Sequence, residues 1–262
     1  MNHSPENRLE ALLALAADEP AHRPEFYRVL LDSEVYVISN MEQEGDGRGW
    51  LTAGDAVSIL TICTDENNPI IPFFTSIEAL TRFVDYQARW IGINARNLFV
   101  LTRGATLVLN PQSQFSQPFY PPMIEALLTT GIHHAPRQTT SQSHAGVHIQ
   151  PPEPYPAKMI DSLIIFFAAR PEVTAAWVAR KQGPGDRRPH LLVGIDASKD
   201  VEKIIREAGS VALDTVPDEQ PEVAFVDMNG IPVEISKAIL HTGRAFYEKS
   251  WGSRLMDRAG RA

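Results

Sequence analysis

The order of hydrophobic and polar positions predicts a series of short strands and amphipathic helices. The most informative stretch runs from Ile70 to Phe83, where an apolar strand passes directly into a helix. The strand is too apolar to face water on both sides, so we expect it in the interior of a sheet. Pro72 has no N–H for a strand ladder, so the strand is either an edge or irregular there. Thr75 or Ser76 then suits the N-cap of the helix.

The same patterns divide the rest of the first half into alternating elements. The expected helices cover 4–17, 24–31, 95–102 and 121–128, and the expected strands cover 35–38, 56–64, 89–94 and 105–109. Ser4 is the expected N-cap of the first helix, and Gly131 is expected to stop the last one. The stretch 40–54 is rich in glycine and charge, which predicts a mobile loop.

The second half follows the same style of pattern. The expected strands cover 173–181, 190–196 and 222–228, and the expected helices cover 156–168, 201–208 with a stop at Gly209, and 233–248. Residues 133–156 between the halves consist largely of His, Pro, Gln, Ser and Thr, without apolar periodicity. We therefore expect an α+β protein with two small mixed sheet-and-helix domains, 1–132 and 157–262, joined by a Pro/His/Ser-rich linker at 133–156.

Composition narrows the classes of function. The chain has 262 residues and a formal net charge of −8, and 44% of its residues are hydrophobic. That charge argues against nucleic acid as a partner, because phosphate binding needs clustered Lys and Arg. We find neither a signal-peptide pattern nor an apolar run of about 18 residues, so we expect no membrane segment and a cytoplasmic location. Cys63, the single cysteine, fits a reducing compartment and is expected to be a small apolar filler on a strand.

The sequence contains no motif that predicts catalysis or a cofactor. The glycines at 45–49 lack the Lys-Ser/Thr ending of a phosphate-binding loop, and no serine has the flanking glycines of a nucleophile elbow. We therefore expect no enzymatic activity.

Two groups of residues invite a metal-site interpretation. His133, His134, His144 and His148 are potential ligands, but no cysteine or acidic partner stands at ligand spacing, so no specific site is expected. The acidic group formed by Asp196, Asp200, Glu202, Asp214 and Asp218 is more typical of a helix start and a solvated loop than of a cation site.

Aromatic-rich segments are the remaining candidates for a functional surface. They occur at 73–74, at 115–120 and near the C-terminus. The candidate interaction surface consists of Pro72, Phe74, Ser76, Phe246, Tyr247 and Trp251. For the segment around Phe74 a strand-to-helix corner built only for packing is the favoured interpretation, and the recognition surface is the alternative.

Several segments resemble the bacterial SseB family, named for enhanced serine sensitivity. They are EPAHRPEFYRVLL (19–31), IPFFTSIEAL (71–80), MIDSL (159–163), LLVGI (191–195), GSVALDT (209–215) and FYEKSWG (246–252). The resemblance runs in order through both halves and implies an N-terminal and a C-terminal SseB domain in a cytoplasmic protein of Gram-negative bacteria. It supplies no catalytic residues.

These observations lead to two functional hypotheses. The first is a non-enzymatic adaptor or regulatory protein that presents apolar patches to a protein partner. The alternative is a protein that binds a small amino-acid-related molecule, or a weak enzyme of amino-acid metabolism. The sequence leaves the oligomeric state open, because edge strands near Pro72 and at 105–109 favour pairing between chains while the acidic surface opposes it.

Overall fold

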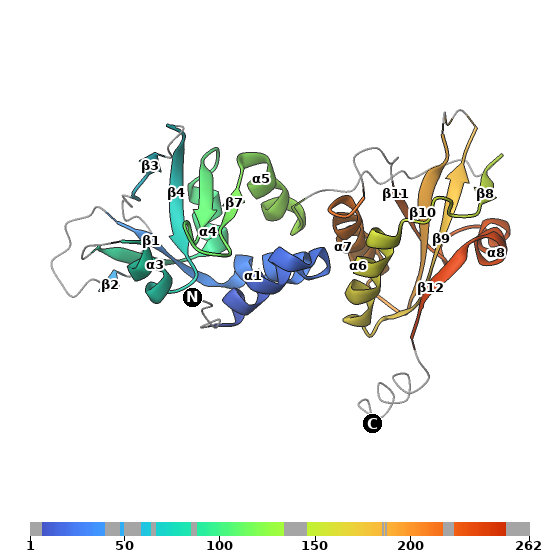
Figure 1. Cartoon of the computed structure of the whole chain (residues 1–262), viewed down its shortest axis with the longest axis horizontal. Coiled ribbons are helices and arrows are strands. Elements are labelled where there is room, and N and C mark those ends of the chain that lie inside the picture. The colour runs from blue at the N-terminus through green and yellow to red at the C-terminus, as the bar shows by residue number, and fades with distance from the viewer. Residues whose placement is uncertain are drawn as a thin grey trace, which may run out of the picture. The chain divides into compact units, whose positions relative to one another are not determined.

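The chain forms two compact units, Met1–His133 and His134–Ala262. The computed structural model describes residues 7–39, 48–49, 59–63, 67–84, 88–133, 146–184, 186, 188–216 and 223–249. Each unit combines a mixed sheet with helices, as expected for the α+β class (Figure 1).

The first unit is built on a sheet of seven described strands. Its helices are α1 (Arg8–Asp18), the 3-10 turn η1 (Pro20–His22), α2 (Arg23–Asp32), α3 (Ile77–Phe83), α4 (Ala95–Leu101) and α5 (Pro121–Thr130). Its strands are β1 (Glu34–Ile38), β2 (Arg48–Gly49), β3 (Ile62–Cys63), β4 (Pro69–Phe74), β5 (Trp90–Asn94), β6 (Thr106–Leu109) and β7 (Gln117–Phe119). The strand order is β2-β5-β1-β4-β6-β7, with β3 paired to β4.

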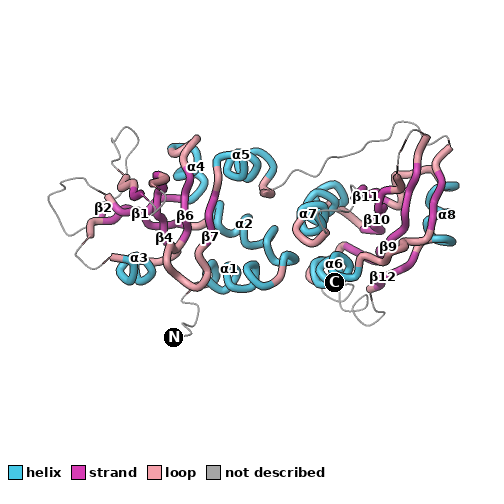
Figure 2. Tube along the Cα trace, turned by 45° about the horizontal axis from the view of Figure 1, so that its top comes forward, coloured by secondary structure: helices cyan, strands magenta, loops and turns pink. Residues whose placement is uncertain are grey.

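The two faces of this sheet are covered unequally. On one face α1, α2, α4 and α5 enclose the main core, which includes the fully buried Phe73, Phe99, Leu107 and Phe119. On the other face α3 packs over a smaller cluster around Phe74. Figure 2 shows α1, α2 and α5 on one side of the strands and α3 on the other.

β4 lies inside the sheet although it contains Pro72. On one side it pairs in parallel with β6 along its length. On its other side Ile70 pairs with β3 and Phe73 pairs with β1. Phe73 O accepts from Asn110 N on the β6 side, and backbone groups alternate along a strand, so the missing N–H of Pro72 faces the side where β3 ends and β1 begins. We call this break in the ladder the Pro72 seam.

Capping explains several helix boundaries. Ser76 is the N-cap of α3, as expected, and its side chain accepts from Ala79 N at 3.0 Å. Gly131 ends α5 with a φ of 76°, a left-handed conformation that favours glycine. The N-cap of α1 is Asn7 and not Ser4, because Asn7 Oδ1 accepts from Glu10 N at 2.9 Å.

Two expectations for the first unit need correction. Cys63 is exposed on the short strand β3 and is not a core filler. Strand β2 lies within the stretch expected to be a loop, and it pairs in parallel with β5; most of 40–54 lies outside the described residues. Strand β7 was not predicted, because its three residues are too few to show an alternating pattern.

The second unit is built on a sheet of five described strands. Its helices are α6 (Ala157–Ala168), α7 (Val201–Leu213) and α8 (Val233–Thr242), and its strands are β8 (His148–Gln150), β9 (Val173–Gln182), β10 (His190–Ala197), β11 (Val223–Asp227) and β12 (Arg244–Glu248). The order is β11-β10-β9-β12, with β8 also paired to β9, and β10 and β11 are parallel. Helices α6 and α7 lie on one face and α8 on the other (Figures 1 and 2).

The boundaries of two helices in this unit differ from the expectation. α7 continues past Gly209 to Leu213, because the small buried residues that follow let the helix stay packed against the core. The segment expected as one helix over 233–248 is instead α8 followed by β12. The break falls at Gly243, where a Cβ would lie 3.1 Å from the carbonyl oxygen of Val178 on β9.

The expected linker extends too far toward the C-terminus. β8 falls within 133–156, and its three residues pair antiparallel with Arg180 to Gln182 of β9. Ile149 of β8 also packs against the cluster under α8. The sheet of the second unit therefore begins at His148. Within the described part of the chain, no helix has the length and apolar character needed to cross a bilayer.

Candidate functional site

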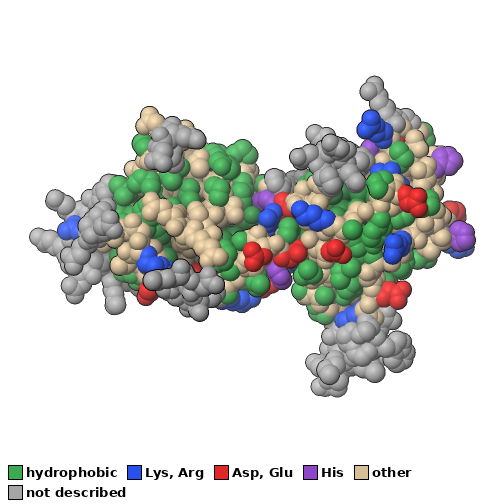
Figure 3. All heavy atoms as spheres, viewed as in Figure 1, with side chains coloured by type: hydrophobic (Ala, Val, Ile, Leu, Met, Phe, Trp, Pro, Cys, Tyr) green, Lys and Arg blue, Asp and Glu red, His purple; other side chains and the backbone are tan. Residues whose placement is uncertain are grey.

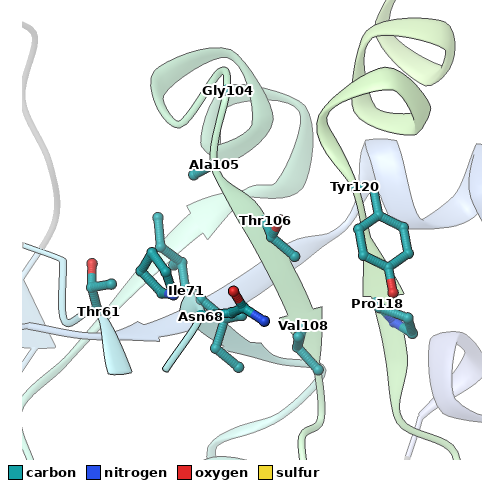
Figure 4. A pocket seen from close by; sticks show the side chains of 11 residues that line it. Thr61, Asn68, Ile71, Gly104, Ala105, Thr106, Val108, Pro118 and Tyr120 are labelled. Carbon is teal, nitrogen blue, oxygen red and sulfur yellow. The ribbon is translucent and has the colours of Figure 1, made fainter. Parts of the chain in front are cut away.

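An open groove of about 690 Å³ lies on the less covered face of the first sheet (Figure 4). It is lined by β4, β6 and β7, by the ends of β3 and β4, and by the turn after α4. The lining residues are Thr61, Asn68, Pro69, Ile70, Ile71, Gly104, Ala105, Thr106, Val108, Pro118 and Tyr120.

The groove follows from the alternation of side chains along neighbouring strands. Leu107 and Phe119 pair with each other and are fully buried on the helix-covered face. Val108 and Pro118 form the next pair and therefore project to the opposite face, where they line the groove. Because α3 packs near Phe74 at the far end of β4, it does not fill this region.

The lining combines apolar and neutral polar surface in nearly equal parts. None of the described lining residues carries a formal charge. Tyr120, the first residue after β7, is 57% exposed and forms one wall beside Pro118 (Figure 4). In Figure 3 the face of the first unit over β4, β7 and α5 is mostly hydrophobic (green) and neutral (tan). Such a surface suits apolar ligand groups, while Thr61 and Tyr120 at its edges and Thr106 in its floor offer neutral hydrogen-bonding groups.

The three candidate residues around β4 do not form an exposed surface. Phe74 is fully buried, with its ring 5.4 Å from that of Phe83. Pro72 is buried within the sheet, and Ser76 is 7% exposed and occupied as the cap of α3. The corner built for packing is therefore what the structure contains, and a partner has no access to these side chains on the folded domain.

The candidates near the C-terminus lie on β12. Phe246 and Tyr247 are half-buried, and both rings contact Phe167 of α6. The Tyr247 hydroxyl donates to Phe167 O at 3.3 Å, and burial raises the pKa of this phenol. These residues attach β12 to α6. Trp251 lies outside the described residues.

A buried polar cluster joins three elements of the first unit, and we call it the Thr75 cluster. The Thr75 hydroxyl donates to Glu10 Oε1 at 2.6 Å and accepts from Asn110 Nδ2 at 2.9 Å. The Ser76 hydroxyl also donates to Glu10 Oε1, at 3.1 Å, and Asn7 Nδ2 donates to Thr75 O.

The Thr75 cluster lies at the carboxyl ends of the parallel strands β4 and β6. Ligand sites are common at such a position in α/β folds. Here, however, the side chains satisfy one another, and Thr75 and Asn110 are almost completely buried. The cluster therefore fixes the first helix to the sheet and is not an open site.

Among the described residues, no group of three His, Cys, Asp or Glu side chains is placed to hold a metal ion. His133 is buried, with its ring 4.9 Å from that of Tyr27, and His148 is an exposed residue of β8. His134 and His144 lie outside the described residues.

The acidic group of the second unit supports local structure. Asp196 accepts from Thr174 Oγ1 at 2.8 Å and from Asn229 Nδ2 at 2.9 Å, so both carboxylate oxygens are used within the fold. Asp200 precedes α7 in a left-handed conformation, and Asp218 lies outside the described residues.

Sequence reasoning found only one wall of the groove. Tyr120 lies in the aromatic-rich segment 115–120, one of the sequence candidates for a functional surface. The floor at Thr106 and Val108 was recognised as part of a strand, but a four-residue strand does not reveal which of its faces a helix covers. That depends on the short helix α3 covering only part of the sheet.

Comparisons with known proteins place both units. The model of the SseB protein N-terminal domain matches residues 9–126, and the model of the SseB protein C-terminal domain matches residues 142–249. Protein SseB of Escherichia coli (strain K12) is 34% identical over 251 residues, which cover 96% of this chain and 95% of that protein. Protein SseB of Shigella flexneri matches with the same identity and coverage. No solved structure matches the chain. The chain therefore belongs to the SseB family and carries both of its domains.

Proposed function

We propose that this protein is a non-enzymatic adaptor or regulatory protein whose N-terminal domain binds an extended, uncharged apolar segment of a partner protein. The observation that carries the proposal is the groove over β4, β6 and β7, whose described lining is uncharged and combines apolar with neutral polar groups. The proposal places the protein in the cytoplasm, where the exposed free thiol of Cys63 is stable.

The chemistry of the lining favours a peptide segment over a free amino acid. Serine and related metabolites carry an ammonium and a carboxylate, and these groups need charged or strongly polar partners when they leave water. The described lining offers only neutral side chains. The groove is also open and much larger than one amino acid, so several consecutive apolar side chains fit it.

The shape of the groove supports an extended ligand. Its floor follows two neighbouring strands, and Tyr120 and Pro118 form a flat wall along one side (Figure 4). Exposed aromatic rings beside prolines are common in grooves that hold extended segments. The family resemblance implies an effect on serine sensitivity. In this proposal that effect acts through a partner protein and not through the binding of serine.

A matched pair of variants tests the groove. Val108→Glu places a charge on the groove floor, while Val100→Glu makes the same change on α4 at a side chain that is 47% exposed and outside the groove. Circular dichroism and thermal melts first establish that both variants are folded. Co-purification from the native bacterium is then compared among the wild type and the two variants, and the partner segment is mapped with synthetic peptides.

Cys63 supplies a direct reporter of binding. It is exposed and pairs with Pro69, which lines the groove, so an environment-sensitive dye on its thiol senses an occupant. We expect saturable binding of an uncharged apolar partner peptide to the wild type and to Val100→Glu, at least a tenfold weaker response for Val108→Glu, and no response to serine. Equal binding by both variants contradicts the proposal, and saturable serine binding supports the small-molecule alternative.

A further inference from the structure

β11 is an edge strand of the second sheet. It pairs in parallel with β10, and it stands at the opposite end of the strand order from β12 (Figure 2). No backbone hydrogen bond joins Val223 or Phe225 to a described residue outside β10.

The direction of the free backbone groups follows from one hydrogen bond. Met228 N donates to Ile195 O on β10 at 2.9 Å. Backbone groups alternate between the two sides of a strand, so the N–H and C=O groups of Val223, Phe225 and Asp227 face away from β10. Among the described residues, the one partner on this side is Gly230, whose N–H donates to the carbonyl of Asp227 in the following turn.

The other described edges carry features that block pairing. β7 contains Pro118. β12 has a register shift between Ala245 and Tyr247 and begins and ends with charged residues. β8 has only three residues. Proline, bulges, charge and shortness are the usual means by which proteins protect exposed strand edges.

β11 lacks most of these protections, although it ends with the charged residue Asp227. It runs for five residues as Val-Ala-Phe-Val-Asp, without proline, lysine, arginine or a bulge, and each of its residues is only half-buried. A regular apolar edge of this kind is a template for a further strand.

We propose that β11 pairs antiparallel with β11 of a second copy of this chain, so that two C-terminal domains share one continuous sheet. With a twofold axis at Phe225, the outward N–H and C=O of each Phe225 bond to those of the other. The outward N–H of Asp227 then donates to the carbonyl of Val223 in the second copy. This arrangement uses the backbone groups of β11 that face away from β10.

The register is self-complementary, and this favours a second copy over an unrelated strand. Ala224 lies opposite Val226 of the second copy, in the closer type of antiparallel pair. Asp227 lies opposite Val223 of the second copy, so the Asp227 carboxylates of the two copies do not face each other. The inference concerns the C-terminal domain and is independent of the groove in the N-terminal domain.

Sedimentation of the full chain gives the first test. The sedimentation coefficient is measured over a range of about a hundredfold in protein concentration, because self-association follows mass action. We expect it to rise from the monomer to the dimer value, and to rise at lower concentration when salt screens the repulsion between copies of net charge −8. A monomer at every concentration overturns the proposal and leaves the edge to another partner.

A matched pair of substitutions locates the interface. Ala224→Glu adds a charge to β11, and Ala245→Glu makes the same change on β12, the opposite edge of the same sheet. We expect Ala224→Glu to weaken dimerisation at least tenfold and Ala245→Glu to leave it unchanged, with thermal melts to verify that both variants are folded. Equal effects from the two variants overturn the assignment to β11.

Cross-linking tests the register and does not depend on the charge variants. In a Cys63→Ser background, Ala224→Cys and Val226→Cys together place thiols opposite each other across the twofold axis, within reach of a disulfide. We expect the double variant to form a covalent dimer on mild oxidation and each single variant to remain monomeric on a non-reducing gel. Dimers from a single variant, or none from the double variant, contradict this register.

Discussion

At the scale of single residues, Thr75 joins separate elements of the first unit through a buried hydroxyl. Thr75 is 4% exposed, and its hydroxyl connects Glu10 on α1 with Asn110, which follows β6. We expect Thr75→Val, which keeps the shape but removes the hydroxyl, to lower the free energy of unfolding by about 1–3 kcal/mol, because buried polar groups lose their partner. Urea denaturation measures the change.

Thr81 provides the control for that substitution. Its hydroxyl is exposed and donates only to Ile77 O within α3. Thr81→Val is expected to change the free energy of unfolding by no more than about 0.5 kcal/mol. If both variants lose the same free energy of unfolding, the Thr75 cluster does not stabilise the connection between α1 and the sheet.

At the scale of elements, an ion pair connects the residue that follows the C-cap of α6 with α7. Arg170 and Glu207 form a salt bridge with side chains only 18% and 13% exposed, and the Arg170 guanidinium also lies over the Phe166 ring. We expect Glu207→Ala to lower the free energy of unfolding by about 2–4 kcal/mol, because it leaves a cation in a largely buried position. Chemical denaturation at low and high salt measures this loss, which salt should change little.

The exposed pair Arg8–Glu25 is the corresponding control. Its side chains are 71% and 40% exposed, and it joins α1 to α2. Glu25→Ala should cost no more than about 1 kcal/mol, and that cost should fall as salt increases. A larger effect at Glu25 than at Glu207 contradicts the assignment.

The helix boundaries also show which structural features sequence patterns can predict. The helix after Ser76 and the stop at Gly131 were predictable, because capping chemistry is local. Gly209 did not stop α7, and the segment beyond Gly243 became a strand, because tertiary packing decided both outcomes. The groove could not be predicted from the sequence for the same reason, since it depends on how much of the sheet α3 covers.

At the scale of the whole molecule, the two units are expected to fold separately, and the start of the second one is testable. A fragment of residues 146–262 keeps β8, whereas a fragment of 157–262 begins where the sequence pattern placed the end of the linker and loses the pairing with β9. We expect the longer fragment to have the higher melting temperature, because Ile149 and the strand pairing are retained. Equal melting temperatures in calorimetry would place the boundary at 157.

The Pro72 seam determines how the rim and the floor of the groove are held in the sheet. Because residue 72 donates no hydrogen bond, β4 itself does not join the β3 and β1 pairings there, and the link between them is the bond from Leu60 N to Ile38 O at 2.9 Å. The rim at Thr61 is joined to β4 only beyond this break, while the floor is held by β6 along the whole of β4. The rim of the groove is therefore held through β3 and the end of β1, while its floor is held through β6.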